Sequence, residues 1–224
     1  MTPRKAASRL NQMRIVLIHA LKHSIVPIEA SFARLWPDVT LMNVLDDSLS
    51  ADVARDGRLT SAMTDRFLSL GRYAASTRAN AILFTCSAFG PCIEAVAREQ
   101  APMPVLKPNE AMIEQAVARG HRIGLLSTFA PTLQSMPGEF PTSVQLVPKL
   151  AEGALAALDR GDRAEHDRLV AQASRDLRDC DLIALAQYSM APAAAMVAAA
   201  SSLPVLTTPD SAVMKLRQLL AVTG

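Results

Sequence analysis

The segment Ala81-Ile-Leu-Phe-Thr-Cys-Ser-Ala-Phe-Gly-Pro91 recurs without a gap as Leu182-Ile-Ala-Leu-Ala-Gln-Tyr-Ser-Met-Ala-Pro192. Each copy begins with a short apolar run that is typical of a strand, and it ends with a proline that suits the first turn of a helix. The repeat therefore predicts two equivalent strand-to-helix turns, with Cys86 and Gln187 at the same position in each.

Two further matches flank this repeat in the same order along the chain. Residues 14–20 match residues 122–128, and residues 104–106 match residues 204–206. Any two βα units resemble one another to a degree, but three matches in one order favour a duplication. The sequence predicts an α/β chain built from two similar halves.

Short apolar runs alternate with amphipathic segments along the whole chain. Continuous apolar strands separated by helices indicate parallel sheets that are covered on both faces. Strands are expected at residues 14–20, 40–45, 81–85, 104–106, 122–127, 143–147, 182–186 and 204–206. Helices are expected at residues 59–78, 91–100, 108–119 and 165–178, where prolines begin the second and third of these.

The repeat also divides the chain into parts. We expect an N-terminal extension without structure over residues 1–12, a first α/β half over 13–107, and a second over 108–206. Residues 207–224 are expected to form a helix that packs on the first half. Because ligands bind beyond the carboxyl ends of parallel strands, a pseudo-twofold axis between the halves would place the active site in the cleft between them.

The composition excludes several classes of protein. The 224 residues are 50% apolar and carry a net charge of +2, and only 4% are aromatic, which does not suit nucleic-acid binding. The chain shows neither an apolar run of about 20 residues nor a signal peptide, so we expect a soluble cytoplasmic protein without a membrane partner. Its three cysteines do not suggest a disulfide framework. A homodimer is expected by analogy only.

Cys86 is the foremost candidate for chemistry. It lies at a strand-to-helix turn, where unpaired N–H groups, including those of Ser87 and Ala88, attract a carboxylate or stabilise a thiolate. A lowered thiol pKa is expected there, although cysteine is also a common small apolar residue in strands. Cys92 and Cys180 are expected to be packing residues.

The second half offers a matching set of polar groups. Ser127, Thr128 and Thr132 follow its first strand, where hydroxyls and helix N–H groups make a cradle for a carboxylate, although ordinary helix capping would also explain them. Tyr188 and Ser189 follow Gln187, and a phenol there could donate a proton or hold a carboxylate.

The first strand ends at His19, which either faces the cleft as a substrate-binding residue or caps the sheet. The four histidines do not cluster with metal-ligand spacing, so neither a metal nor a cofactor is expected.

These features together resemble the aspartate/glutamate/hydantoin racemase superfamily, which also contains arylmalonate decarboxylases and maleate isomerases. The resemblance covers the chain from Arg14 onward and rests on the duplicated halves, on Thr85-Cys86-Ser87, and on the turn at 124–128. It implies two cysteines that face each other across the cleft and move a proton next to a carboxylate without cofactor or metal.

Carried onto this sequence, the resemblance makes Cys86 the first-half thiol. It also assigns Ser87, Thr128 and Tyr188 to the positions that hold the substrate carboxylate. Gln187 stands where the second thiol is expected. An amide does not transfer protons near neutral pH, so Gln187 is expected to be a substrate-binding residue.

Three hypotheses follow. The first is a cofactor-independent isomerase or racemase of a small carboxylate, with Cys86 as acid/base or nucleophile and Tyr188 or His19 in place of the second thiol. The second is a decarboxylase of a substituted malonate-type diacid. The third is a non-catalytic carboxylate-binding protein.

Overall fold

The computed structural model describes residues 13–222, so the extension expected over residues 1–12 lies outside the described part of the chain. Two four-stranded parallel sheets form the framework. The first contains β1 (Arg14–His19), β2 (Thr40–Leu45), β3 (Ala81–Phe84) and β4 (Val105–Leu106). The second contains β5 (Arg122–Ser127), β6 (Gln145–Leu150), β7 (Leu182–Leu185) and β8 (Val205–Thr207).

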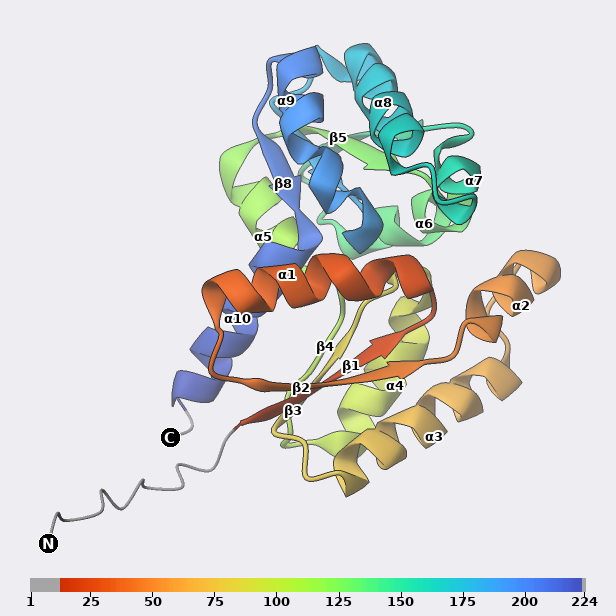
Figure 1. The fold of residues 1–224 in the computed structure, drawn as a ribbon, viewed down its shortest axis with the longest axis vertical. Helices are drawn as coiled ribbons and strands as arrows, with labels where there is room; N and C mark the ends of the chain where they lie inside the picture. The colour runs from red at the N-terminus through yellow and green to blue at the C-terminus, as the bar shows by residue number, and fades with distance from the viewer. Residues whose placement is uncertain (1–12, 223–224) are drawn as a thin grey trace, which may run out of the picture.

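The order of the strands is the same in both sheets. It is β2-β1-β3-β4 in the first and β6-β5-β7-β8 in the second, with every pair parallel. The predicted α/β class with two similar halves is therefore confirmed. Figure 1 shows the second sheet and its helices above the first. We propose that these two sets of elements correspond to the halves expected over 13–107 and 108–206.

One strand differs from its prediction. β6 runs from Gln145 to Leu150, whereas the sequence predicts a strand over 143–147 that ends before Pro148. Pro148 instead pairs with Leu125 of β5. Because β6 is at the edge of its sheet, one of its sides forms no ladder hydrogen bonds, and a residue without an N–H is tolerated there.

Helices cover both faces of each sheet. The α-helices up to the second sheet are α1 (Ile25–Leu35), α2 (Ser48–Asp56), α3 (Ser61–Ser76), α4 (Gly90–Gln100) and α5 (Glu110–Arg119). The later ones are α6 (Ala130–Ser135), α7 (Ala154–Asp159), α8 (Arg163–Ser174), α9 (Ala194–Ser201) and α10 (Thr208–Val222). Short 3₁₀ turns are η1 (Lys22–Ser24), η2 (Ser87–Phe89), η3 (Met136–Glu139), η4 (Arg175–Leu177) and η5 (Tyr188–Ala193).

The four helices expected from the sequence are present. α5 begins two residues later than predicted, because Pro108 precedes the helix and Asn109 is its N-cap. No helix within residues 13–222 is long and apolar enough to cross a membrane.

The last helix after each sheet packs on the other sheet. α5 follows β4, yet its Met112 and Ala116 lie in one apolar cluster with Ile123 of β5. α10 follows β8, yet its Leu216 packs with Ile15 of β1. In Figure 1, α10 (blue) accordingly runs beside α1 (red), and α5 (green) lies with the second sheet. This reciprocal exchange ties the halves together.

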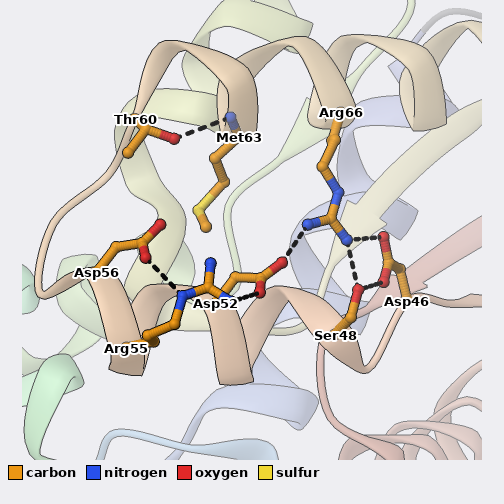
Figure 2. Close-up of polar contacts among 8 residues, drawn as sticks. All are labelled: Asp46, Ser48, Asp52, Arg55, Asp56, Thr60, Met63 and Arg66. Atoms are coloured by element: carbon orange, nitrogen blue, oxygen red, sulfur yellow. Dashed lines mark hydrogen bonds and ion pairs between the residues drawn. The ribbon is translucent and has the colours of Figure 1, made fainter.

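A polar network holds α2 against α3 (Figure 2). The Arg66 guanidinium of α3 donates to Asp46, Ser48 and Asp52, each at 2.6 Å. The hydroxyl of Thr60 caps α3 by accepting a hydrogen bond at 3.2 Å from a backbone N–H of its first turn. The network fixes the position of α2, which contributes to the candidate site.

Candidate active site

The turns that carry Cys86 and Gln187 are structurally equivalent. Both residues are N-caps of 3₁₀ turns with extended backbones, at φ −122° and ψ 122° for Cys86 and φ −138° and ψ 145° for Gln187. The residue before each extends its sheet, because Thr85 N–H bonds a carbonyl of β1 at 3.0 Å and Ala186 N–H bonds one of β5 at 2.9 Å. The equivalence seen in the sequence thus has a geometric basis.

Cys86 is buried, and its thiol interacts with two polar groups. These are the backbone N–H of Ala88 in its own turn and the hydroxyl of Ser50 on α2. Burial nevertheless raises the pKa of the Cys86 thiol to about 11, so the thiol is protonated near neutral pH. The prediction of a lowered pKa is therefore wrong, because loss of solvation outweighs the hydrogen bonds at this turn.

The two turns meet through buried hydroxyl groups. Ser87 Oγ donates to the carbonyl oxygen of Ala186 at 3.2 Å and lies 3.1 Å from Thr132 Oγ1. Ser135 of α6 donates to the carbonyl oxygen of Ser87 at 3.4 Å. Residues from both halves that the sequence proposes as ligand groups, Ser87 and Thr132, are therefore in contact.

The predicted carboxylate cradle in the second half is occupied by the protein itself. Gln187 Oε1 lies 2.8 Å from Ser127 Oγ, 2.6 Å from the backbone nitrogen of Thr128 and 3.0 Å from Thr128 Oγ1. A backbone N–H only donates, so the amide oxygen must point toward it and the amide nitrogen away from it. The sequence does not reveal this contact, because Gln187 and Thr128 are far apart in the chain.

His19 is fully buried, and both its ring nitrogens are engaged. Nδ1 lies 2.7 Å from Thr85 Oγ1, and Nε2 lies 2.9 Å from the side-chain oxygen of Asn43. The Asn43 amide nitrogen donates to Glu29 at 2.7 Å, which fixes its oxygen toward His19. Burial lowers the pKa of His19, so the ring is neutral with its proton on Nε2. The hydrogen bonds of His19 therefore join three neighbouring strands, as in the alternative in which this residue caps the sheet.

Tyr188 lies in the apolar core. Its ring packs with Ile15, Leu17 and Phe32, and its hydroxyl donates to the carbonyl oxygen of Pro108 at 3.4 Å. Burial raises the pKa of Tyr188, so its phenol is a poor acid at neutral pH. These contacts do not support the catalytic role expected from the sequence.

Packing in the core accounts for the positions of the remaining candidate residues. Ser189 is buried within the 3₁₀ turn that follows Gln187. Cys92 and Cys180 lie in two apolar core clusters, as expected for packing residues. Within residues 13–222, no three His, Cys, Asp or Glu side chains lie close enough to hold a metal ion. Ser50 is a neighbour of the thiol that the sequence does not indicate, because no pattern distinguishes it from any serine on a helix.

A groove of about 390 Å³ opens beside the Cys86 turn. It lies between the α2–α3 connection in the first half and α6 in the second, and Ala88 contributes to its wall. Its lining is mixed: the apolar side chains are Val53, Ala54, Leu59, Ala88, Ala130 and Pro131, and the polar ones are Arg58, Gln134 and Ser135. The groove has the size and character to hold an apolar substituent of a small molecule.

Comparisons with known proteins agree with this architecture. The sequence model of the Asp/Glu/Hydantoin racemase family matches residues 28–136. None of the curated protein sequences is significantly similar to the chain.

Solved structures extend the likeness to nearly the whole chain. A glutamate racemase from Francisella tularensis, in complex with D-glutamate, superposes with a TM-score of 0.73 at 13% identity over 96% of this chain and 83% of that one. An allantoin racemase from Klebsiella pneumoniae gives 0.71 at 18% identity over 94% and 89%. Unliganded arylmalonate decarboxylase gives 0.62 at 17% identity over 92% of each chain. At these identities the likeness concerns the fold.

Proposed function

Since this chain belongs to the Asp/Glu/hydantoin racemase family, we propose that it is a cofactor-independent isomerase that transfers a proton at the carbon next to a carboxylate. The observation that carries the proposal is the setting of Cys86. A buried thiol stands at a strand-to-helix turn, in contact with the N–H of Ala88, where the halves meet. Cys86 is the proposed acid/base.

The proposed reaction has two half-steps. In the small thiolate fraction that a pKa of about 11 leaves near neutral pH, Cys86 takes the proton from the substrate carbon; the C–H bond breaks, an S–H bond forms, and the electron pair moves onto the carboxylate as an enediolate. Return of a proton from the thiol to the same carbon gives exchange alone, so isomerisation by this one thiol requires that the proton return to another carbon of the delocalised anion. The developing charge needs hydrogen-bond donors, and loss of one such donor typically costs about 3–4 kcal/mol in the barrier.

A decarboxylase is the second candidate, and the raised pKa of Cys86 favours it. When a malonate-type diacid loses carbon dioxide, the carbon–carbon bond breaks and its electron pair remains as an enediolate. A thiol that burial keeps protonated is suited to supply the proton that this enediolate needs. The superposition on arylmalonate decarboxylase agrees with this candidate at the level of the fold.

The test is to incubate the protein with a panel of small 2-substituted acids and diacids in D₂O. Uptake of deuterium next to the carboxylate and release of carbon dioxide are followed by NMR and mass spectrometry. We expect Cys86→Ala to lower the rate by about 10²–10⁴-fold, the range for removal of a general acid/base.

Cys92→Ala is the matched control, since this second buried cysteine of the first half packs in the core, and it should retain turnover. Full activity of Cys86→Ala would exclude the proposal. Binding of acids without exchange, isomerisation or carbon dioxide release would favour a non-catalytic carboxylate-binding protein.

A further inference from the structure

Gln187 is the residue of the second half that corresponds to Cys86. Both are N-caps just beyond the third strand of their sheets, and Ser87 beside Cys86 bonds Ala186 beside Gln187 at 3.2 Å. The two side chains therefore leave adjacent turns on opposite halves. A small substrate bound at this junction can therefore contact both turns.

The Gln187 side chain is held in one orientation. Three donors, the Ser127 hydroxyl and the Thr128 N–H and hydroxyl, lie within 3.0 Å of Oε1. Rotation of the amide by 180° would place Nε2 against a backbone N–H, and both of those groups are donors. These contacts also use the donors that were expected to bind the substrate carboxylate.

The amide nitrogen remains available. Nε2 makes no hydrogen bond to any residue in the described part of the chain, although Gln187 is only 7% exposed. It is also not among the buried polar atoms that lack a partner. Nε2 therefore reaches accessible space with both of its N–H groups unused, and hydrogen bonds to the amide oxygen strengthen the nitrogen as a donor.

We propose that Gln187 is a specificity-determining residue whose amide N–H groups bind a carboxylate oxygen of the substrate, so that protons are exchanged only on the Cys86 side. An amide binds the enediolate charge but neither removes nor supplies a proton. Amino-acid enantiomers then undergo one-sided exchange without racemisation, and isomerisation is a shift of the proton to another carbon on the Cys86 face. This inference rests on the proposed function.

Binding is tested with malonate, a small diacid probe, by calorimetry on the full chain. Gln187→Glu keeps an oxygen for the three donors but replaces the N–H groups by a second carboxylate oxygen. We expect its dissociation constant for malonate to rise by about tenfold or more, the usual effect of losing a hydrogen bond to a charged group. Gln172→Glu on α8, which adds the same charge elsewhere, should bind as the parent protein does.

Face selectivity is tested with the separate enantiomers of aspartate and glutamate in D₂O. We expect the parent protein to exchange the α-proton of only one enantiomer of a pair, without forming the other. Thermal unfolding of Gln187→Glu within about 3 °C of the parent would show that the change in binding does not come from loss of structure.

The outcomes separate this inference from the proposed function. The role of Gln187 would be overturned if Cys86 exchanged the protons of both enantiomers. It would also be overturned if the parent and Gln187→Glu bound malonate equally well. Both results would leave the proposed function standing. Exchange that persists in Cys86→Ala, or absence of both exchange and malonate binding in the parent protein, would overturn both.

Discussion

At the scale of single residues, loss of solvation determines the pKa of the Cys86 thiol. Burial raises its pKa to about 11, and the contacts to Ala88 N–H and Ser50 only moderate this increase. Since the thiolate is the reactive form, we expect alkylation of Cys86 to accelerate by about tenfold per pH unit up to about pH 11. The measurement is the rate of carbamidomethylation, read by mass spectrometry in a Cys92→Ala/Cys180→Ala background.

Ser50→Ala provides a comparison for this profile. Removal of the Ser50 hydroxyl, which moderates the raised pKa of the thiol, should raise this pKa further and slow alkylation at any given pH below the transition. A rate that levels off near pH 8 in the parent protein would contradict the expected environment of the thiol.

At the scale of elements, the position of α2 depends on Arg66. This guanidinium binds Asp46, Ser48 and Asp52, and α2 carries Ser50 to the thiol. We expect Arg66→Leu to lower the free energy of unfolding by about 1–2 kcal/mol, because its partners are partly exposed. We also expect faster alkylation of Cys86 at fixed pH, since α2 is less firmly held.

Arg55→Leu is the control for Arg66→Leu. Arg55 is more exposed, and its ion pairs with Asp52 and Asp56 lie within α2, so its loss does not separate α2 from α3. Denaturant unfolding and alkylation rates are compared for the two variants. Equal effects would show that the link between α2 and α3 has no special role.

The secondary-structure elements also show which features of the fold can be predicted from the sequence. The strands and the four expected helices follow from local apolar patterns, and the equivalence of Cys86 and Gln187 follows from the repeat. The burial of Tyr188 and the contact between Gln187 and Thr128 depend on which segments pack together, and no local pattern records that. Residues adjacent in sequence, such as Gln187 and Tyr188, leave one turn in different directions.

At the scale of the whole molecule, the junction between the halves contains a carboxyl group sensitive to pH. Glu139 follows α6 in the second half, and burial raises its pKa from 4.5 to about 7. Lys107 opposes this shift, whereas Glu110 and Glu94 add to it, and one Glu139 oxygen is buried without a partner among the described residues.

The sign of the pH effect follows from the raised pKa. The folded state retains a proton on Glu139 that the unfolded state loses above about pH 4.5, so the stability from this group is full below that pH and is lost as pH rises through 7. We expect Glu139→Gln to be more stable than the parent by about 1–3 kcal/mol at pH 8 and nearly equal at pH 4. Thermal unfolding at both pH values measures this.

Glu152→Gln serves as the control, because Glu152 is exposed and is not among the groups that shift the pKa of Glu139. This substitution also removes one negative charge, and its effect on stability should differ much less between pH 4 and pH 8. An equal difference in stability between Glu139→Gln and the parent at both pH values would show that packing, and not titration of Glu139, causes the difference.

The exchange of α5 and α10 between the two sheets has a consequence for the origin of the fold. Neither half covers its own sheet with the helix that follows its last strand. A shorter ancestor with one such half would have left that helix without a sheet, unless two copies traded helices as in domain swapping. Fusion of two such copies would give the present connectivity.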